Sequence, residues 1–157
     1  MSAPVLLERR IVSGDAAATR ELGARLAPAA RAGDLVCLRG DLGAGKTQLA
    51  KGFGAGLGVT DTILSPSFVL MAEYAGRLPL FHVDLYRLAD ASDALNGGLL
   101  DDRQADGVTL VEWPERMGAL LPTARLDVAI EGSGDGPRTI IIRAGSPDLA
   151  RYLETLP

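Results

Sequence analysis

Short apolar runs along the chain predict strands, because runs of about four to eight such residues between turn signals are typical of sheets. The run 35–38 is nearly unbroken, which favours a strand buried on both faces of a parallel sheet. The run 108–113 has the same character and is stopped by Pro114. The other predicted strands are 5–12, 68–74, 78–86, 126–130 and 138–143. The last two flank a glycine-rich turn and therefore predict a C-terminal β-hairpin.

Helical spacing appears in three places between these runs. Leu22 and Leu26 share one side of a first helix, which Ser13 or Asp15 can cap and which extends to about residue 31. A last helix is expected from Asp148 to Leu156, and the polar stretch 89–107 is expected to hold only short helical pieces. Strand, helix, strand, helix and then several strands predict an α/β fold: a mixed β-sheet flanked by helices, with the C-terminal hairpin and a terminal helix.

The second helix begins at Lys46 and places Leu49, Phe53 and Leu57 at i, i+4 and i+8. It also carries glycines at 52, 54 and 56, each of which costs up to ~1 kcal/mol relative to alanine. This helix must therefore be stabilised by its packing and by what it binds at its N-terminus.

Composition narrows the class of protein. The 157 residues are 47% hydrophobic and 23% charged, which suits one soluble domain spanning 1–157. The formal net charge of −4 disfavours direct binding to nucleic acid, so we expect no DNA partner, and contact with RNA through a partner or a small local patch. A single cysteine, Cys37, cannot form an intramolecular disulfide. Charged residues occur as early as Glu8, so no signal peptide is visible, and no apolar run approaches the ~18 residues that span a membrane. These features predict a cytoplasmic protein with no membrane segment.

The residues 40–47, Gly-Asp-Leu-Gly-Ala-Gly-Lys-Thr, match the P-loop pattern G-x-x-x-x-G-K-[ST] at every defined position. The motif follows an apolar strand and opens a helix, as its chemistry requires. Backbone amides of such a loop and the helix N-terminus bind phosphate oxygens. Lys46 supplies a charge for the β- and γ-phosphates, and the Thr47 hydroxyl is a ligand for Mg²⁺. We therefore predict binding of a nucleoside triphosphate with Mg²⁺.

A P-loop also needs a carboxylate at the end of a nearby strand to hold magnesium. Asp84 and Glu112 each end an apolar run. Glu112 follows the more uniformly apolar run, so we expect it to lie against the P-loop and bind the metal. Alternation places Asp84 on a polar face with His82 and Tyr86, nearer to a water that could attack the γ-phosphate.

Several residues and functions stay open at this level. His82 is the only histidine, which excludes a zinc cluster built on histidines and a catalytic triad. Arg87 and Arg103 are either solvated side chains or a built-in arginine finger, and Trp113 either packs the strand end or serves the site. A small-molecule kinase and a nucleotide-dependent switch remain alternatives to an ATPase. The guanine-reading Asn-Lys-x-Asp motif is absent, which disfavours a GTPase.

Four segments in this order resemble one family: the P-loop, Ser-Pro-Ser-Phe at 65–68, His-Val-Asp-Leu-Tyr-Arg-Leu at 82–88 and Val-Glu-Trp-Pro at 111–114. The chain is similar to the bacterial TsaE (YjeE) ATPases, which take part in making threonylcarbamoyladenosine at position 37 of tRNA. The resemblance runs from about Thr19 through the terminal hairpin. It implies that residues 1–157 form a single P-loop ATPase domain whose activity is stimulated by partners. This ATPase would act on the complex of TsaD with TsaB and would contact tRNA only indirectly.

The same resemblance implies roles for particular positions. Leu42, Gly43, Ala44, Gly45, Lys46 and Thr47 would wrap the triphosphate of ATP. Thr47 and Glu112 would ligate Mg²⁺, while Lys46 and Asp84 would serve catalysis. The 65–68 segment would be a switch-like loop. Residues before the first helix and the turn near Gly136 would approach the adenosine. The family usually has threonine where this chain has Ser67. It often has threonine where this chain has Gln48, and the role of Gln48 is left open.

Overall fold

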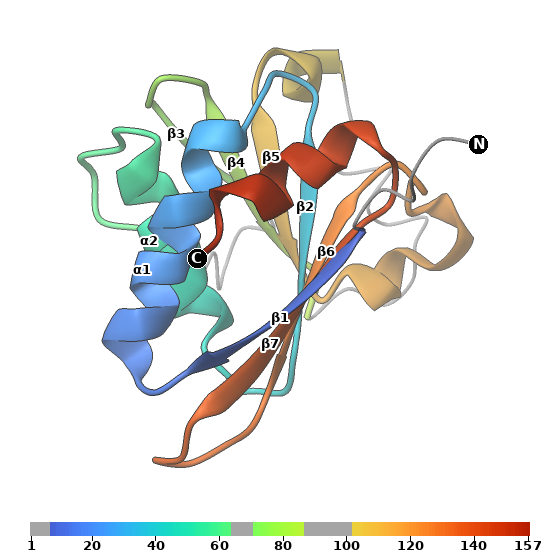
Figure 1. The fold of residues 1–157 in the computed structure, drawn as a ribbon. Coiled ribbons are helices and arrows are strands. Elements are labelled where there is room, and N and C mark those ends of the chain that lie inside the picture. Colours follow the sequence, from blue (N-terminus) through green and yellow to red (C-terminus); the bar gives the residue numbers. More distant parts are fainter. Residues whose placement is uncertain (1–6, 64–70, 87–101) are drawn as a thin grey trace.

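A seven-stranded mixed β-sheet forms the centre of the computed structural model, which describes residues 7–63, 71–86 and 102–157 (Figure 1). The strands are β1 Glu8–Ser13, β2 Leu35–Arg39, β3 Met71–Tyr74, β4 Leu80–Asp84, β5 Val108–Glu112, β6 Leu126–Glu131 and β7 Arg138–Ala144. The α-helices are α1 Ala16–Leu26 and α2 Lys46–Gly56. Short 3₁₀ helices are η1 Ala27–Ala29, η2 Asp102–Asp106, η3 Pro114–Leu120 and η4 Asp148–Thr155. The predicted α/β fold is confirmed.

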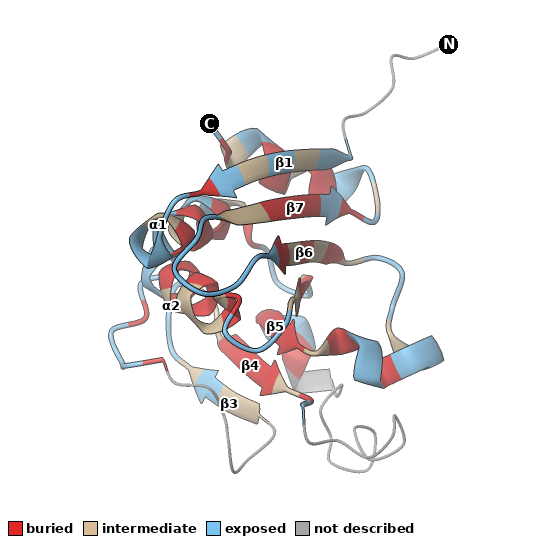
Figure 2. Ribbon diagram, turned by 90° about the horizontal axis from the view of Figure 1, so that it is seen from below, coloured by how far each residue is buried: buried red, intermediate tan, exposed pale blue. Residues whose placement is uncertain are grey.

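The strand order is β1-β7-β6-β2-β5-β4-β3. β2 runs parallel to β5 and β6, and β4 runs parallel to β5, whereas both edges of the sheet are antiparallel. β2 is the middle strand of the sheet and β5 is its neighbour, and both are almost wholly buried, as their unbroken apolar runs predict. Figure 2 shows the buried residues of β5. Because parallel strands end at the same edge, the carboxyl ends of β2, β4 and β5 meet on one side of the molecule.

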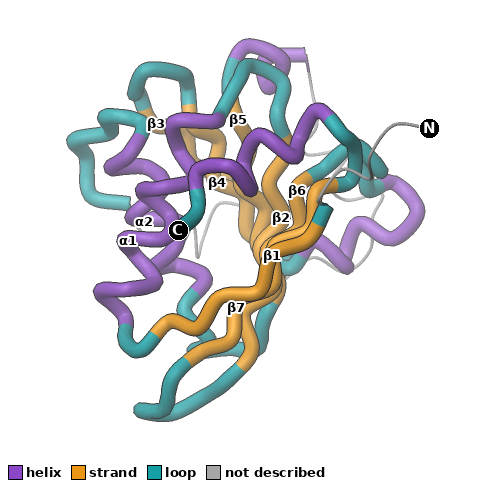
Figure 3. Tube along the Cα trace, in the orientation of Figure 1, coloured by secondary structure: helices purple, strands orange, loops and turns teal. Residues whose placement is uncertain are grey.

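Both α-helices and η4 lie on one face of the sheet, while η3 lies on the other (Figures 1 and 3). The larger core cluster joins the first face to these helices, with Leu26, Leu49 and Phe53 fully buried. A smaller cluster around Cys37 and Val111 is covered by Met117 from η3. Cys37 is a buried free thiol whose pKa is raised to about 12 by burial.

The glycines of α2 are explained by its contact with α1. A Cβ on Gly52 would lie 1.7 Å from the Arg20 carbonyl oxygen of α1. On the facing side, a Cβ on Gly23 would lie 2.2 Å from the Leu49 carbonyl oxygen. The two helices therefore pack backbone against backbone, which offsets the low helix propensity of glycine.

Element boundaries differ from the sequence expectation in a few places. Asp15 caps α1 by accepting a hydrogen bond from the Ala18 amide at 2.8 Å, whereas the Ser13 hydroxyl lies 2.7 Å from that of Thr19. The α-helix ends at Leu26 and continues only as the 3₁₀ turn η1, which contains Pro28. The terminal helix is present, but with 3₁₀ hydrogen bonding. Within the described ranges, no helix is long and apolar enough to cross a membrane.

Candidate functional site

The P-loop lies between the end of β2 and the start of α2. Gly40, Gly43 and Gly45 have φ angles of 151°, 80° and 116°, which side chains with a Cβ rarely adopt. At Gly40 a Cβ would also lie 2.7 Å from the Ile130 carbonyl oxygen. The loop therefore needs glycine at these positions, and it brings the backbone amides of residues 43–47 to the N-terminus of α2. Such an arrangement binds anions.

Lys46 opens α2 and is buried, with 6% of its surface exposed. Its Nζ donates a hydrogen bond to the Gly40 carbonyl and lies 3.7 Å from the centroid of the Trp113 ring. Burial lowers the pKa of Lys46, while the nearby carboxylates, Glu112 foremost, act in the opposite direction. The ammonium group thus lies between the P-loop and the strand-end acids.

The two strand-end acids lie side by side. Asp84 and Glu112 are register partners at the ends of β4 and β5, and Glu112 is also paired with Leu38 of β2, two residues before the P-loop. Glu112 is 3% exposed and its Oε2 lies 2.6 Å from Nε2 of His82. Asp84 is less buried, and its Oδ1 accepts a hydrogen bond from the Tyr86 amide at 2.9 Å.

The oxygen ligands offered here suit Mg²⁺. Among the described residues, no three His, Cys, Asp or Glu side chains come together in a cage for a metal ion. Mg²⁺ does not need such a cage, because it is usually held by one or two protein oxygens together with phosphates and water. His82 contacts Oε2 of Glu112, and a carboxylate has a second oxygen that can serve as a metal ligand. The Thr47 hydroxyl and the Glu112 carboxylate are oxygen ligands of the kind that such an ion takes.

Trp113 belongs to this site, which the sequence alone left open. It has a φ of 59°, the single positive value among the described residues other than glycine. Its ring packs against that of Tyr86, with the ring centroids 5.0 Å apart and the planes tilted by 46°, and it also covers Lys46. This backbone conformation turns the chain sharply after Glu112, so that the indole lies over the lysine rather than continuing the strand.

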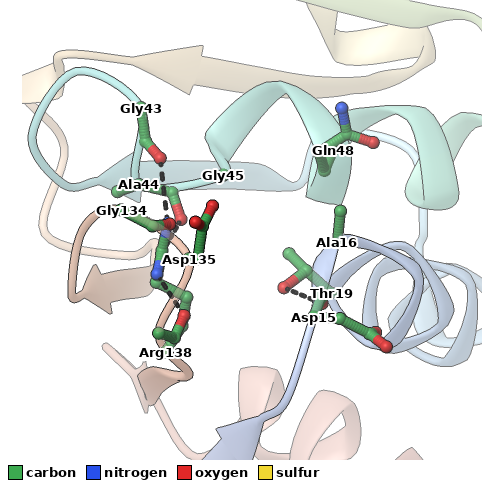
Figure 4. A pocket seen from close by; sticks show the side chains of 11 residues that line it. Asp15, Ala16, Thr19, Gly43, Ala44, Gly45, Gln48, Gly134, Asp135 and Arg138 are labelled. Carbon is green, nitrogen blue, oxygen red and sulfur yellow. Dashed lines mark hydrogen bonds between the residues drawn. The ribbon is translucent and has the colours of Figure 1, made fainter.

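A cavity of about 320 Å³ lies next to the P-loop (Figure 4). Three elements that are distant in the sequence form its walls: the P-loop, the N-terminus of α1 and the β6–β7 turn. Its lining residues are Asp15, Ala16, Thr19, Gly43, Ala44, Gly45, Gln48, Gly134, Asp135, Gly136 and Arg138. The structure therefore brings Gly136 and the start of the first helix to the P-loop. Gln48 lines the cavity too, and its Oε1 accepts a hydrogen bond from Nε of Arg20 at 2.8 Å.

Sequence reasoning missed Arg138. Its guanidinium lies between the P-loop and the β6–β7 turn, where its hydrogen bonds to described residues all go to backbone carbonyls. No motif marks such a residue, because its partners are main-chain atoms of any sequence. The segment 65–68, which includes Ser67, and Arg87 lie outside the described residues, as does the side chain of Arg103.

Comparisons with known proteins agree on one family. The family model described as "Threonylcarbamoyl adenosine biosynthesis protein TsaE" matches residues 13–140. Two curated relatives bear the name "tRNA threonylcarbamoyladenosine biosynthesis protein TsaE". The one from Bacillus subtilis (strain 168) is 43% identical over 127 residues, 80% of this chain and 79% of the relative. The one from Treponema pallidum (strain Nichols) is 38% identical over 133 residues, which cover 85% of this chain and 98% of the relative.

Among solved structures, "Crystal structure of Bacillus subtilus YdiB" superposes with a TM-score of 0.78 at 33% identity. The superposition covers 98% of this chain and 95% of that one. The residues matched by the family model include the P-loop, Asp84, Glu112 and the β6–β7 turn.

Proposed function

The chain belongs to the TsaE family, and from this premise we propose that it binds and hydrolyses ATP with Mg²⁺ in support of threonylcarbamoyladenosine formation on tRNA. Because the chain belongs to this family, it shares the family's role in the biosynthesis of that nucleoside. The observation that carries the ATPase proposal is the P-loop together with the adjoining cavity of about 320 Å³. A triphosphate on the loop and a nucleoside in the cavity account for both features.

Triphosphate binding falls to residues 42–47. The amides of the loop and the first turn of α2 donate hydrogen bonds to phosphate oxygens. Lys46, held between the loop and the acids, neutralises charge on the β- and γ-phosphates. Gly136 and the start of α1 enclose the nucleoside from the other two walls.

One carboxylate binds the metal ion, and a different carboxylate orients the attacking water. Thr47 and Glu112 would hold Mg²⁺, which would supply positive charge to neutralise the charge that develops on the phosphates. Asp84 lies beside Glu112 but is less buried, and it supports hydrolysis by orienting the attacking water. Water attacks the γ-phosphorus, the bond from this phosphorus to the β–γ bridging oxygen breaks, and ADP, inorganic phosphate and a proton are released.

The protein acts on other proteins rather than on tRNA directly. Its net charge of −4 suits a partner complex better than a polyanion. The complex of TsaD with TsaB in the cytoplasm is the partner implied by the family, and it stimulates ATP turnover.

The test is phosphate release from MgATP by the purified chain, alone and with TsaD and TsaB, without any other acceptor. We expect release that requires Mg²⁺ and rises with the partner complex. ATP should outcompete GTP for the isolated protein, and EDTA should weaken binding. Phosphate transfer that needs an added small-molecule acceptor would indicate a kinase instead. Tight binding without release, with or without the complex, would indicate a nucleotide-dependent switch.

A further inference from the structure

The guanidinium of Arg138, the first residue of β7, donates hydrogen bonds to five backbone carbonyls in two loops. Figure 4 shows Arg138 beside the residues that line the cavity. On the P-loop side it contacts Ala44 at 3.0 Å and Gly43 at 3.4 Å. On the side of the β6–β7 turn its partners are the oxygens of Ser133 at 3.2 Å, Gly134 at 2.9 Å and Gly136 at 2.5 Å. We refer to this set of contacts as the Arg138 clamp.

The clamp uses the whole hydrogen-bonding capacity of arginine. A guanidinium group has five N–H donors, one on Nε and two on each terminal nitrogen. The contacts comprise one bond from Nε, two from Nη1 and two from Nη2. All three guanidinium nitrogens therefore donate to backbone carbonyls. Arg138 acts on the site through the backbone that it holds.

On the P-loop side, the clamp fixes the orientation of two peptide planes. In a trans peptide the C=O and the following N–H point in opposite directions. Bonds to the carbonyls of Gly43 and Ala44 therefore turn the amides of Ala44 and Gly45 away from Arg138. The loop also has anchors of its own, since the Ala44 amide donates to the Asp41 carbonyl at 3.0 Å and Lys46 donates to the Gly40 carbonyl.

The β6–β7 turn is in a different situation. Residues 132–137 are exposed, and Gly132 and Gly134 have φ angles of 127° and 64°. A glycine-rich exposed turn has many accessible conformations, so keeping it in one place has a large entropic cost. Three bonds to a single guanidinium hold it beside the P-loop, where Gly134 and Gly136 form one wall of the cavity.

We propose that Arg138 is a positioning residue that holds the β6–β7 turn against the P-loop and so couples recognition of the nucleoside to binding of the triphosphate. This inference rests on the proposed function. Without the clamp, the P-loop keeps its other anchors and still binds phosphates. The cavity loses a fixed wall, and only ligands that carry a nucleoside lose affinity.

The experiment compares two ligands, MgATP and Mg²⁺ with inorganic tripolyphosphate, by calorimetry on the whole chain. The variants are Arg138→Gln, which lacks the charge, and Arg138→Lys, whose single ammonium cannot reach both loops. Arg143→Gln is the matched control, because Arg143 lies on the same strand but pairs with exposed Glu8 at 2.5 Å. Thermal unfolding of each variant checks that it is folded.

We expect both Arg138 variants to bind ATP about tenfold more weakly or worse, and tripolyphosphate within about threefold of the wild type. The control should leave both affinities unchanged. Equal losses for the two ligands would overturn the coupling and assign Arg138 to the triphosphate alone. Unchanged ATP affinity in folded Arg138→Lys would show that the clamp is dispensable. A wild-type protein that binds neither ligand would overturn the proposed function, and this inference with it.

Discussion

Nε2 of His82 lies 2.6 Å from Oε2 of Glu112, and both side chains are buried. His82 is on β4 and Glu112 ends β5, so the contact joins neighbouring parallel strands at the edge that carries the P-loop. Among the described residues, Nδ1 of His82 has no hydrogen-bond partner. A single proton on Nε2, donated to the carboxylate, satisfies this contact. The geometry makes His82 the residue that orients the carboxylate of Glu112.

The first prediction concerns removal of that donor. His82→Leu leaves a buried carboxylate without its partner, so the free energy of unfolding should fall by about 3 kcal/mol. His82→Gln keeps an N–H near the position of Nε2 and should recover a large part of this loss. Urea unfolding measures both. His82→Leu and His82→Gln should also differ from each other in the Mg²⁺ concentration that they need for ATP binding. A leucine variant as stable as the wild type would contradict the role of this contact.

The second prediction concerns Lys46. Its ammonium lies between the P-loop and the strand-end acids, so Lys46→Ala removes a charge that would face the phosphates. Loss of such a contact costs roughly 2–5 kcal/mol, and ATP affinity should fall by more than about tenfold. Lys51→Ala, further along α2, is the control and should bind ATP normally. Calorimetry that found Lys46→Ala within about threefold of the wild type would refute the assignment.

Much of the fold follows from local patterns. The apolar runs of β2 and β5 predict central parallel strands, and the glycine-rich turn at 132–137 predicts the C-terminal hairpin; the structure has both. The end of α1 and the 3₁₀ form of η4 depend on backbone detail near Pro28 and Pro147, which hydrophobic spacing does not report.

Part of the candidate site also follows from local sequence patterns, and part depends on contacts between distant residues. Residues 40–47 carry a local signature because glycine, lysine and threonine each meet a separate requirement of phosphate binding. The Arg138 clamp and the His82–Glu112 contact join residues 94 and 30 positions apart. Such contacts arise only when strands are placed side by side, so no spacing along the chain predicts them.

The third prediction tests the contact between α1 and α2. Alanine at Gly52 would place its Cβ 1.7 Å from the Arg20 carbonyl oxygen, and the helices must move apart. Such overpacking costs about 1–3 kcal/mol, more than the ~1 kcal/mol that alanine gains in helix propensity. Gly54→Ala is the matched control, since its Cβ would meet the tip of the flexible Ile63 side chain at 2.0 Å. Chemical unfolding should show a clear loss of stability for Gly52→Ala and a smaller one for Gly54→Ala. Equal stabilities would contradict backbone contact between the helices.

The fourth prediction concerns alkaline pH. Burial raises the pKa of the Cys37 thiol from 9.0 to about 12. Above pH 9 the unfolded chain loses this proton while the folded protein keeps it. The associated stability is therefore complete below pH 9 and is lost as the pH rises towards 12, by up to about 4 kcal/mol.

Cys37→Ala separates this effect from other titrations. Tyr152, whose pKa is also raised by burial, titrates in both proteins. Urea unfolding between pH 8 and about 11 should show a steeper loss of stability in the wild type than in Cys37→Ala. Parallel curves for the two proteins would mean that the thiol is not protected by the fold.

The last prediction divides the work of the two strand-end acids. Glu112 is buried beside the P-loop, whereas Asp84 lies next to it on β4 and is less buried. A carboxylate that aids only the chemical step contributes little to ground-state binding, so its removal lowers kcat and leaves affinity almost intact. A ligand to the metal contributes to both. Asp84→Asn should therefore bind MgATP normally but lose turnover in the presence of the partner complex.

Glu112→Gln should behave differently because its effect appears in binding itself. The amide oxygen of the glutamine can still accept a hydrogen bond from Nε2 of His82, so the fold is kept while the negative charge near Lys46 is lost. ATP binding by this variant should depend much less on Mg²⁺ than binding by the wild type. The measurement is ATP affinity with Mg²⁺ and with EDTA for both variants, beside partner-stimulated phosphate release. Full turnover by Asp84→Asn, or identical binding behaviour of the two variants, would refute this division of roles. The P-loop assignment would survive either result, since it rests on residues 40–47 and the adjoining cavity.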